Sequence, residues 1–278
     1  MRSFQQDTEL KGGAGRYVAV LHESWRGWSP LGGYLAGIAL RAAGRESVFD
    51  TPLSITCHFL SVGGFGPCDV EVVSLRRASV AELLEVRLRQ GAKTLLLAHV
   101  WTGQNSEGFE HTDLPSPAIP MVSEVPPMEE LYPNWAKTLG EWPYLGNIEQ
   151  RVVGYERDGL RREARAPRNV QWFRFNLDVD YADPYLNAAR YALALDIIGW
   201  DAVKLPHPGD GRFYAPTLSL HADIHALSEE PWFVAEAWVP VAGSGRFALT
   251  NRVWSADGRP LASAAGTSLC RPRPSSLP

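Results

Sequence analysis

The chain has 278 residues, of which 45% are hydrophobic, 21% charged and 10% aromatic, and its formal net charge is −4 at pH 7. This balance is typical of a globular protein and excludes a disordered, collagen-like or coiled-coil chain. The chain has 27 basic and 31 acidic residues. Because it has no excess of positive charge to attract the phosphates of a nucleic acid, we expect no nucleic-acid partner. The length predicts two domains or one large one.

Cysteine spacing and the N-terminus bear on cofactors and location. Cys57, Cys68 and Cys270 are odd in number, and no two form the Cys-x-x-Cys of zinc or redox sites. No phosphate-binding glycine motif follows a strand, so we expect neither metal nor cofactor. Because the N-terminus lacks an apolar signal core and no long apolar stretch occurs, we expect a cytoplasmic protein without a membrane span.

The first part of the chain predicts one helix among antiparallel strands. The helix covers residues 31–43, and it is so rich in small and apolar residues that it must be buried. Short runs separated by Gly and Ser predict strands in a meander. These predicted strands cover residues 16–23, 53–60, 69–75, 81–89 and 94–101.

Prolines recur between residues 115 and 143, too densely for a helix or a central strand. We interpret this segment as a linker. The predicted division is therefore an N-terminal domain over residues 1–114, a linker over 115–145 and a C-terminal domain over 146–278.

The second part repeats the order of the first. Asp183 is a plausible N-cap for a helix over residues 184–198, and Gly199 follows its predicted end. The predicted strands cover residues 148–155, 170–178, 217–225, 232–241, 246–255 and 261–269. A shift of 165 residues places Ser219 on Ser54, so we infer a weak internal repeat.

One strand of the second half carries a row of polar side chains. Between apolar residues that would cover the helix, the strand at 217–225 places Ser219, His221 and Asp223 on its other face, about 6.6 to 7 Å apart. An imidazole oriented by a carboxylate can serve as a general base, so these three residues are candidate catalytic residues. The alternative is that the row forms the solvated outer face of a half-buried sheet.

A long central helix wrapped by an antiparallel sheet, twice over, resembles the double-hotdog proteins of the acyl-CoA thioesterase family, the thioesterase II-like group. The stretches that carry the resemblance are residues 30–37, 52–60, 215–220 and 252–263. The resemblance implies an α+β fold made of two tandem hotdog units. It also implies hydrolysis of the thioester between an acyl group and coenzyme A, without a metal.

The resemblance further implies an aspartate on the second-half strand after the helix, a hydroxyl residue and a glutamine on the last strand, which orient the attacking water. Carried onto this sequence, the aspartate position falls on Ser219, or on His221 if the strand is shifted by two residues. The hydroxyl position falls within residues 239–242, which contain no Ser or Thr, and the glutamine position falls on Gly266, next to Thr267, a candidate substrate-binding residue. None of these three positions holds the residue type that the resemblance implies, so we expect a rearranged site.

Candidate substrate-binding residues surround the start of the first helix. Gly32, Gly33 and Tyr34 would offer free backbone N–H groups at the positive helix end, where the resemblance implies that the thioester carbonyl binds. The alternative is that the glycines only permit close packing. Trp28 would line an acyl pocket or the core.

Two titratable residues add to these candidates. His58 would approach Asp223 if the two sheets join edge to edge, or it has only a structural role. Asp196 lies within the apolar second helix. It is either a desolvated acid or base with a raised pKa, or a residue on a wet stripe of the helix.

No Gly-x-Ser-x-Gly elbow occurs, since Gly243-Ser244-Gly245 is typical of a hairpin turn, and this excludes an α/β-hydrolase. We therefore favour an acyl-CoA thioesterase-like hydrolase with a non-standard site. The alternatives are a protein that binds an acyl or apolar ligand without hydrolysis, and an enzyme of dehydration or cyclisation in a biosynthetic pathway. The expected partners are acyl-CoA, another acyl thioester or an apolar small molecule, and further copies of the chain in a homo-oligomer.

Overall fold

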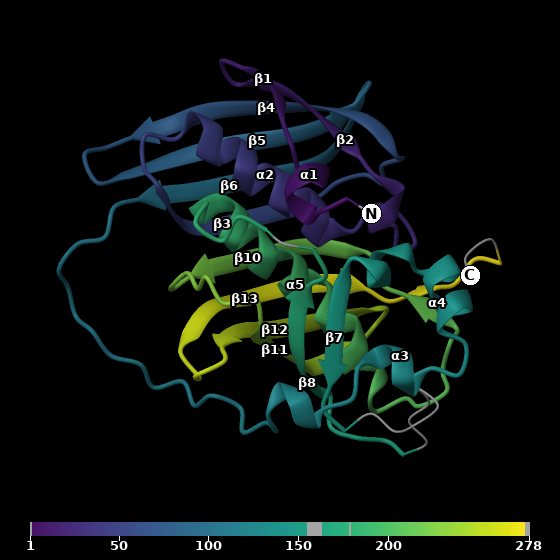
Figure 1. Cartoon of the computed structure of the whole chain (residues 1–278). Coiled ribbons are helices and arrows are strands. Elements are labelled where there is room, and N and C mark those ends of the chain that lie inside the picture. Colours follow the sequence, from purple (N-terminus) through teal and green to yellow (C-terminus); the bar gives the residue numbers. More distant parts are fainter. Residues whose placement is uncertain (1, 155–162, 178, 276–278) are drawn as a thin grey trace.

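The computed structural model describes residues 2–154, 163–177 and 179–275, and an antiparallel sheet of twelve strands runs through it (Figure 1). The first half supplies β1 (Lys11–Gly13), β2 (Arg16–Leu21), β3 (Thr51–Phe59), β4 (Gly66–Arg77), β5 (Ala81–Gln90) and β6 (Lys93–Gly103). The second half supplies β7 (Ile148–Val152), β8 (Arg168–Phe175), β10 (Thr217–Ile224), β11 (Phe233–Gly243), β12 (Arg246–Ser255) and β13 (Pro260–Leu269). The order in the sheet is β1-β2-β4-β5-β6-β3-β10-β13-β12-β11-β8-β7. A separate pair joins β9 (Phe213–Tyr214) to β14 (Arg271–Pro272).

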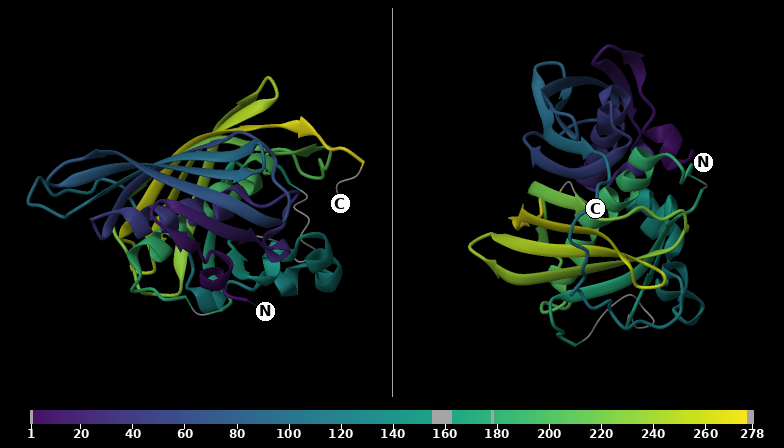
Figure 2. Two further views of the ribbon diagram at one scale, coloured as in Figure 1. Left: turned by 90° about the horizontal axis from the view of Figure 1, so that it is seen from above. Right: turned by 90° about the vertical axis from the view of Figure 1, so that its left-hand side faces the viewer.

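Each half of the sheet wraps around one long helix, α2 (Gly32–Glu46) in the first half and α5 (Pro184–Lys204) in the second, while α1 (Phe4–Asp7) is a single turn. The two helices run antiparallel in contact with each other: a Cβ on Gly33 would lie 2.6 Å from Leu193 Cα, and one on Gly44 would lie 2.5 Å from the Tyr185 ring. The glycines of α2 are thus needed for helix packing. Figure 2 shows the two halves side by side in its right-hand view.

The two half-sheets join edge to edge through β3 and β10, which is the arrangement on which the expected approach of His58 to Asp223 depended. In the observed register His58 lies opposite Ser219, and Ser54 lies opposite Asp223. The prediction that His58 approaches Asp223 is therefore wrong, because antiparallel pairing reverses the order that a simple repeat shift preserves.

Most predicted strands agree with the structure to within a few residues, but β10 differs in one consequential place. A bulge between Thr217 and Ser219 shifts its register against β13. A bulge sends neighbouring side chains to the opposite faces from those that strict alternation predicts. Leu218, expected to cover the helix, is 41% exposed, and Thr217 instead faces α5.

The predicted end of the second helix is wrong. The helix continues through Gly199 to Lys204, where a Cβ on Gly199 would lie 3.1 Å from Leu249 Cδ2. This glycine allows close packing of α5 on the sheet rather than ending the helix. The predicted strand ends at Tyr155 and Asp178 lie outside the described residues.

The proline-rich segment contains short helices, contrary to the prediction. They are the 3-10 turns η2 (Val122–Glu124) and η3 (Pro143–Gly146) and the helices α3 (Met128–Leu131) and α4 (Trp135–Glu141). Pro127 and Pro143 stand at helix starts, where a missing N–H costs nothing. In Figure 1 the segment runs from β6 around to the second half. The proposed domain boundaries at 114/115 and 145/146 stay a prediction.

The hairpin between β11 and β12 turns through Ser244 and Gly245, both at positive φ (51° and 71°), as predicted for this turn. Within the described residues, no helix has the length and apolar character needed to cross a membrane.

Candidate active site

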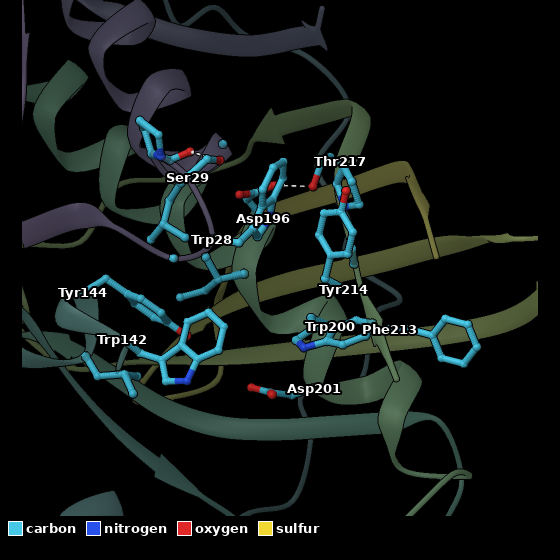
Figure 3. A pocket seen from close by; sticks show the side chains of 18 of the residues that line it. Trp28, Ser29, Trp142, Tyr144, Asp196, Trp200, Asp201, Phe213, Tyr214 and Thr217 are labelled. Carbon is cyan, nitrogen blue, oxygen red and sulfur yellow. Dashed lines mark hydrogen bonds between the residues drawn. The ribbon is translucent and has the colours of Figure 1, made fainter. Parts of the chain in front are cut away.

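A cavity of about 580 Å³ lies between the start of α2, the second half of α5, the linker helices and β9 (Figure 3). This volume is within the usual range for small-molecule sites. Many of the residues that line it are aromatic: Trp28, Phe59, Tyr132, Trp142, Tyr144, Trp200, Phe213 and Tyr214. Such a lining is suited to a largely apolar ligand.

Asp196 brings three separate elements together at this cavity. Its Oδ2 accepts a hydrogen bond of 2.7 Å from the backbone N–H of Gly33, at the start of α2. Its Oδ1 accepts a hydrogen bond of 2.9 Å from the hydroxyl of Thr217, at the start of β10 (Figure 3). The carboxylate itself projects from α5 and lines the cavity, so its position is fixed while it remains accessible from the cavity.

The surroundings of Asp196 raise the pKa of its carboxyl group. Desolvation is the main cause, and the hydrogen bonds from Gly33 and Thr217 act in the opposite direction by favouring the charged form. A carboxylate with a raised pKa is a stronger base than an exposed one. This combination of enclosure, fixed orientation and raised pKa is typical of a general acid or base.

The N-terminus of α2 offers further donors beside this carboxylate. Whereas Gly33 N–H is bonded to Asp196, the described residues provide no hydrogen-bond partner for the N–H groups of Gly32 and Tyr34. A Cβ on Gly32 would lie 2.9 Å from Asp196 Oδ2, so this approach requires glycine. Free N–H groups at the positive end of a helix can stabilise a developing oxyanion.

The predicted substrate-binding residues of the first half separate into two environments. Gly32 and Trp28 line the cavity, and the Trp28 ring meets Tyr214 edge-on at 5.0 Å between centroids. Gly33 positions Asp196 through its N–H. The side chain of Tyr34, in contrast, is buried in the core, where its hydroxyl donates to the Asp7 carbonyl at 2.6 Å.

The remaining predicted site residues gather on the outer face of the sheet, around the β3–β10 joint. Ser219 on β10 lies opposite His58 of β3 on one side and opposite Thr267 of β13 on the other. His221 Nε2 lies 3.3 Å from Asp223 Oδ1, and their side chains are 46% and 53% exposed. We name Ser219, His221 and Asp223 the outer row; its catalytic role stays a prediction.

The sequence pattern indicates Asp196 as a candidate acid or base, but it does not indicate Thr217 as its partner. An aspartate and a threonine do meet in this fold, on α5 and at the start of β10, and not at the positions to which the resemblance assigned them. Gly266, the assigned glutamine position, faces the core, where a Cβ would lie 3.4 Å from Leu220 Cδ1. The isolated carboxylate in an apolar helix was the signal for Asp196, whereas no signal marked the bulge that turns Thr217.

Comparisons with known proteins match this architecture. The acyl-CoA thioesterase N-terminal domain matches residues 21–103, and the acyl-CoA thioesterase C-terminal domain matches residues 122–269. A comparison of the sequence with curated proteins gives no match.

Solved structures support the fold over nearly the whole chain. A protein of unknown function with a hot dog fold from Alicyclobacillus acidocaldarius is 20% identical with a TM-score of 0.80, covering 99% of this chain and 100% of that one. An acyl-CoA thioesterase II from Mycobacterium marinum is 18% identical with a TM-score of 0.79, covering 98% and 99%. A dehydratase domain of the curacin polyketide synthase is 12% identical with a TM-score of 0.57, covering 95% of each chain.

At these identities the structural likeness shows the fold alone, and it confirms the predicted α+β double hotdog. The C-terminal-domain match by itself spans more than half of the chain, so this protein belongs to the acyl-CoA thioesterase family.

Proposed function

We propose that the protein hydrolyses acyl-CoA thioesters in the aromatic cavity, with Asp196 as the general base. The observation that carries this proposal is the carboxylate itself, which lines the cavity and is held by Gly33 N–H at 2.7 Å and by the Thr217 hydroxyl at 2.9 Å. A general base must be oriented and must reach a water molecule next to the reacting carbon. Asp196 meets the first condition through its two donors and the second through its access to the cavity.

In this mechanism Asp196 accepts a proton from water as the water oxygen bonds to the thioester carbonyl carbon. The carbonyl oxygen becomes anionic and accepts a hydrogen bond from the N–H group of Gly32, which lines the cavity at the start of α2. The intermediate then collapses: the carbon–sulfur bond breaks, and the coenzyme A thiolate takes the proton held by Asp196. The products are a carboxylic acid and free coenzyme A.

The lining of the cavity supports both parts of this substrate. Trp142, Tyr144 and Trp200 provide apolar surface for an acyl chain. Arg273 and Lys204, the latter paired with Asp201 at 3.1 Å, line the same cavity, and their cationic groups suit the phosphates of coenzyme A. A cytoplasmic location and association into homo-oligomers remain predictions from the sequence.

The test is thiol release from a panel of acyl-CoAs, from acetyl to palmitoyl with one aromatic member, detected with a thiol-reactive dye. Asp196→Asn should lower kcat/KM by about 10²- to 10⁴-fold, the usual contribution of a general base. Asp223→Asn is the matched control, since it makes the same substitution on the outer face of the sheet. Melting temperatures of both variants would show that they are folded.

The outcomes separate the candidate sites. If Asp223→Asn loses activity while Asp196→Asn retains it, the base belongs to the outer row and the present assignment is wrong. If the wild-type protein releases no thiol from any member of the panel, hydrolysis of acyl-CoA is contradicted, and ligand binding without turnover becomes the better account.

A further inference from the structure

Three uncharged amide side chains lie side by side in the second half, beside the cavity. Gln150 on β7 and Gln171 and Asn169 on β8 all face the interior, with exposed fractions of 6%, 0% and 2%. The amide nitrogen and oxygen of both Gln171 and Asn169 are buried without any hydrogen-bond partner among the described residues. We name Gln150, Gln171 and Asn169 the amide row.

The amide row reaches the cavity at one end only, through Gln150. Gln150 lines the cavity directly. In the β7–β8 register Gln150 lies opposite Phe173 and Val152 lies opposite Gln171, so the two glutamines are diagonal neighbours, about 7–8 Å apart and within reach of long side chains. Met128, which also lines the cavity, packs against Val152. Gln171 therefore lies directly behind the cavity wall.

The lack of partners distinguishes this row from an ordinary buried amide. Asn251, on β12, also has an unpaired Oδ1 among the described residues, but it donates from Nδ2 to the Leu195 carbonyl at 2.6 Å and so holds α5 against the sheet. No such bond ties Gln171 or Asn169 to its surroundings in the described part of the chain. Since buried polar groups in folded proteins are nearly always paired, the two unpaired amides of this row, next to Gln150 in the cavity wall, point to a ligand that pairs with them.

The chemistry of the row restricts what that ligand group can be. An amide both donates and accepts hydrogen bonds, so it suits a hydroxyl or carbonyl group. A carboxylate placed there would be buried without a cationic partner in the row, which is strongly unfavourable. A purely hydrocarbon chain would leave the amides unpaired.

We propose that the amide row recognises a neutral oxygen-bearing group, a hydroxyl or carbonyl, carried on the acyl chain away from the thioester. This inference rests on the proposed function, because it takes the cavity as the acyl site. The substrate class is then oxygenated acyl-CoA rather than plain fatty acyl-CoA.

The test uses coenzyme A thioethers, which cannot be hydrolysed. Calorimetry compares octyl-CoA with 8-hydroxyoctyl-CoA, and dodecyl-CoA with 12-hydroxydodecyl-CoA. The wild-type protein should bind the hydroxylated member of at least one pair about 10-fold more tightly, as expected for one or two well-placed hydrogen bonds. The double variant Gln150→Leu/Gln171→Leu, which nearly keeps side-chain volume, should lose this preference.

Gln104→Leu is the matched control, because Gln104 is exposed and does not line the cavity. It should keep the full preference. Equal binding of both members of each pair by the wild-type protein, or an unchanged preference in the double variant, would overturn the inference.

The same measurements separate this inference from the proposed hydrolysis. Thiol release from acyl-CoAs without a hydroxyl preference overturns the role of the amide row alone. A hydroxyl preference without thiol release, either from the panel or from 8-hydroxyoctanoyl-CoA and 12-hydroxydodecanoyl-CoA, overturns hydrolysis alone. If no thioether binds, the cavity is not an acyl-CoA site and both are wrong.

Discussion

Two aspartates of the second half, Asp196 and Asp223, differ in their solvent exposure and in their hydrogen-bond partners. Asp196 projects from α5 into the cavity and accepts hydrogen bonds from Gly33 N–H and the Thr217 hydroxyl. Asp223 lies on β10, half-exposed on the outer face of the sheet, where its Oδ1 lies 3.3 Å from His221 Nε2. Asp196 is fixed from two directions, whereas Asp223 faces solvent.

The difference matters because solvent screens what an exposed charge can do. An exposed ion pair typically contributes about 0–1 kcal/mol, and its geometry is loosely held. A desolvated carboxylate with defined donors keeps one orientation, and the pKa of Asp196 is raised by this desolvation. The comparison therefore favours the cavity over the outer row as the place of catalysis, and three further experiments test this difference between the two aspartates.

The largest effect is expected from Gly33→Ala. A Cβ at this position would lie 2.6 Å from Leu193 Cα and 2.9 Å from the Ala192 carbonyl oxygen, both backbone atoms that cannot simply rotate away. Overpacking of this kind costs about 1–3 kcal/mol of unfolding free energy, and sometimes more. Because the helices would separate at the point where Gly33 N–H meets Asp196, kcat/KM should fall as well. Denaturant unfolding and thiol release measure the two effects.

Gly140→Ala is the control for this substitution. Gly140 lies in the short helix α4, and a Cβ there would meet nothing within 4 Å. This variant should be more stable by up to about 1 kcal/mol, since alanine favours the helix. If Gly33→Ala behaves like Gly140→Ala, the close contact of α2 with α5 does not hold the carboxylate in place.

A smaller loss is expected from Thr217→Val. The substitution keeps the shape but removes the hydroxyl that donates to Asp196 Oδ1 at 2.9 Å. A hydrogen bond to a charged group contributes about 1.5–3 kcal/mol, so kcat/KM should fall by about 10- to 100-fold. Thr56→Val is the matched control, because Thr56 pairs with His221 Nδ1 at 2.8 Å on the outer face. Equal losses in both variants would contradict the separation of the two sites.

Much of the fold could be predicted because its signals are local. Alternation of apolar residues located the strands, and the small apolar residues of α2 identified a buried helix. The end of α5 was missed because Gly199, a usual helix-ending residue, instead lets the helix pack at 3.1 Å against Leu249. That contact depends on a strand fifty residues further along the chain, which local pattern cannot show.

The site was less predictable, for the same reason. Strict alternation placed Thr217 on the outer face, yet the bulge between Thr217 and Ser219 turns it towards Asp196. A bulge depends on the pairing of β10 with β13, and the sequence contains no local mark of it. The N–H of Gly33 reaches Asp196 across 163 residues of chain, so only the packing of the two helices reveals that pair.

The smallest effect concerns the dependence of stability on pH. Desolvation raises the pKa of Asp196 in the folded protein above its value in the unfolded chain, which is about 3.9. Between these two pKa values the folded state holds more protons than the unfolded state, so the group's contribution to the free energy of unfolding falls as pH rises through that window. Above the pKa of the folded state the full cost of the ionised carboxylate is present.

Asp196→Asn removes this titration. The stability of the variant relative to wild type should therefore increase as pH rises through the window and then stay constant, which thermal unfolding in a series of buffers from acid to neutral pH would measure. Asp223→Asn in the same buffers separates the local effect from the change in net charge. A difference that turns increasingly in favour of the wild type would mean that the donors Gly33 and Thr217 outweigh desolvation. In that case Asp196 would be a weaker base than its enclosure implies, and its catalytic role would have to rest on orientation alone.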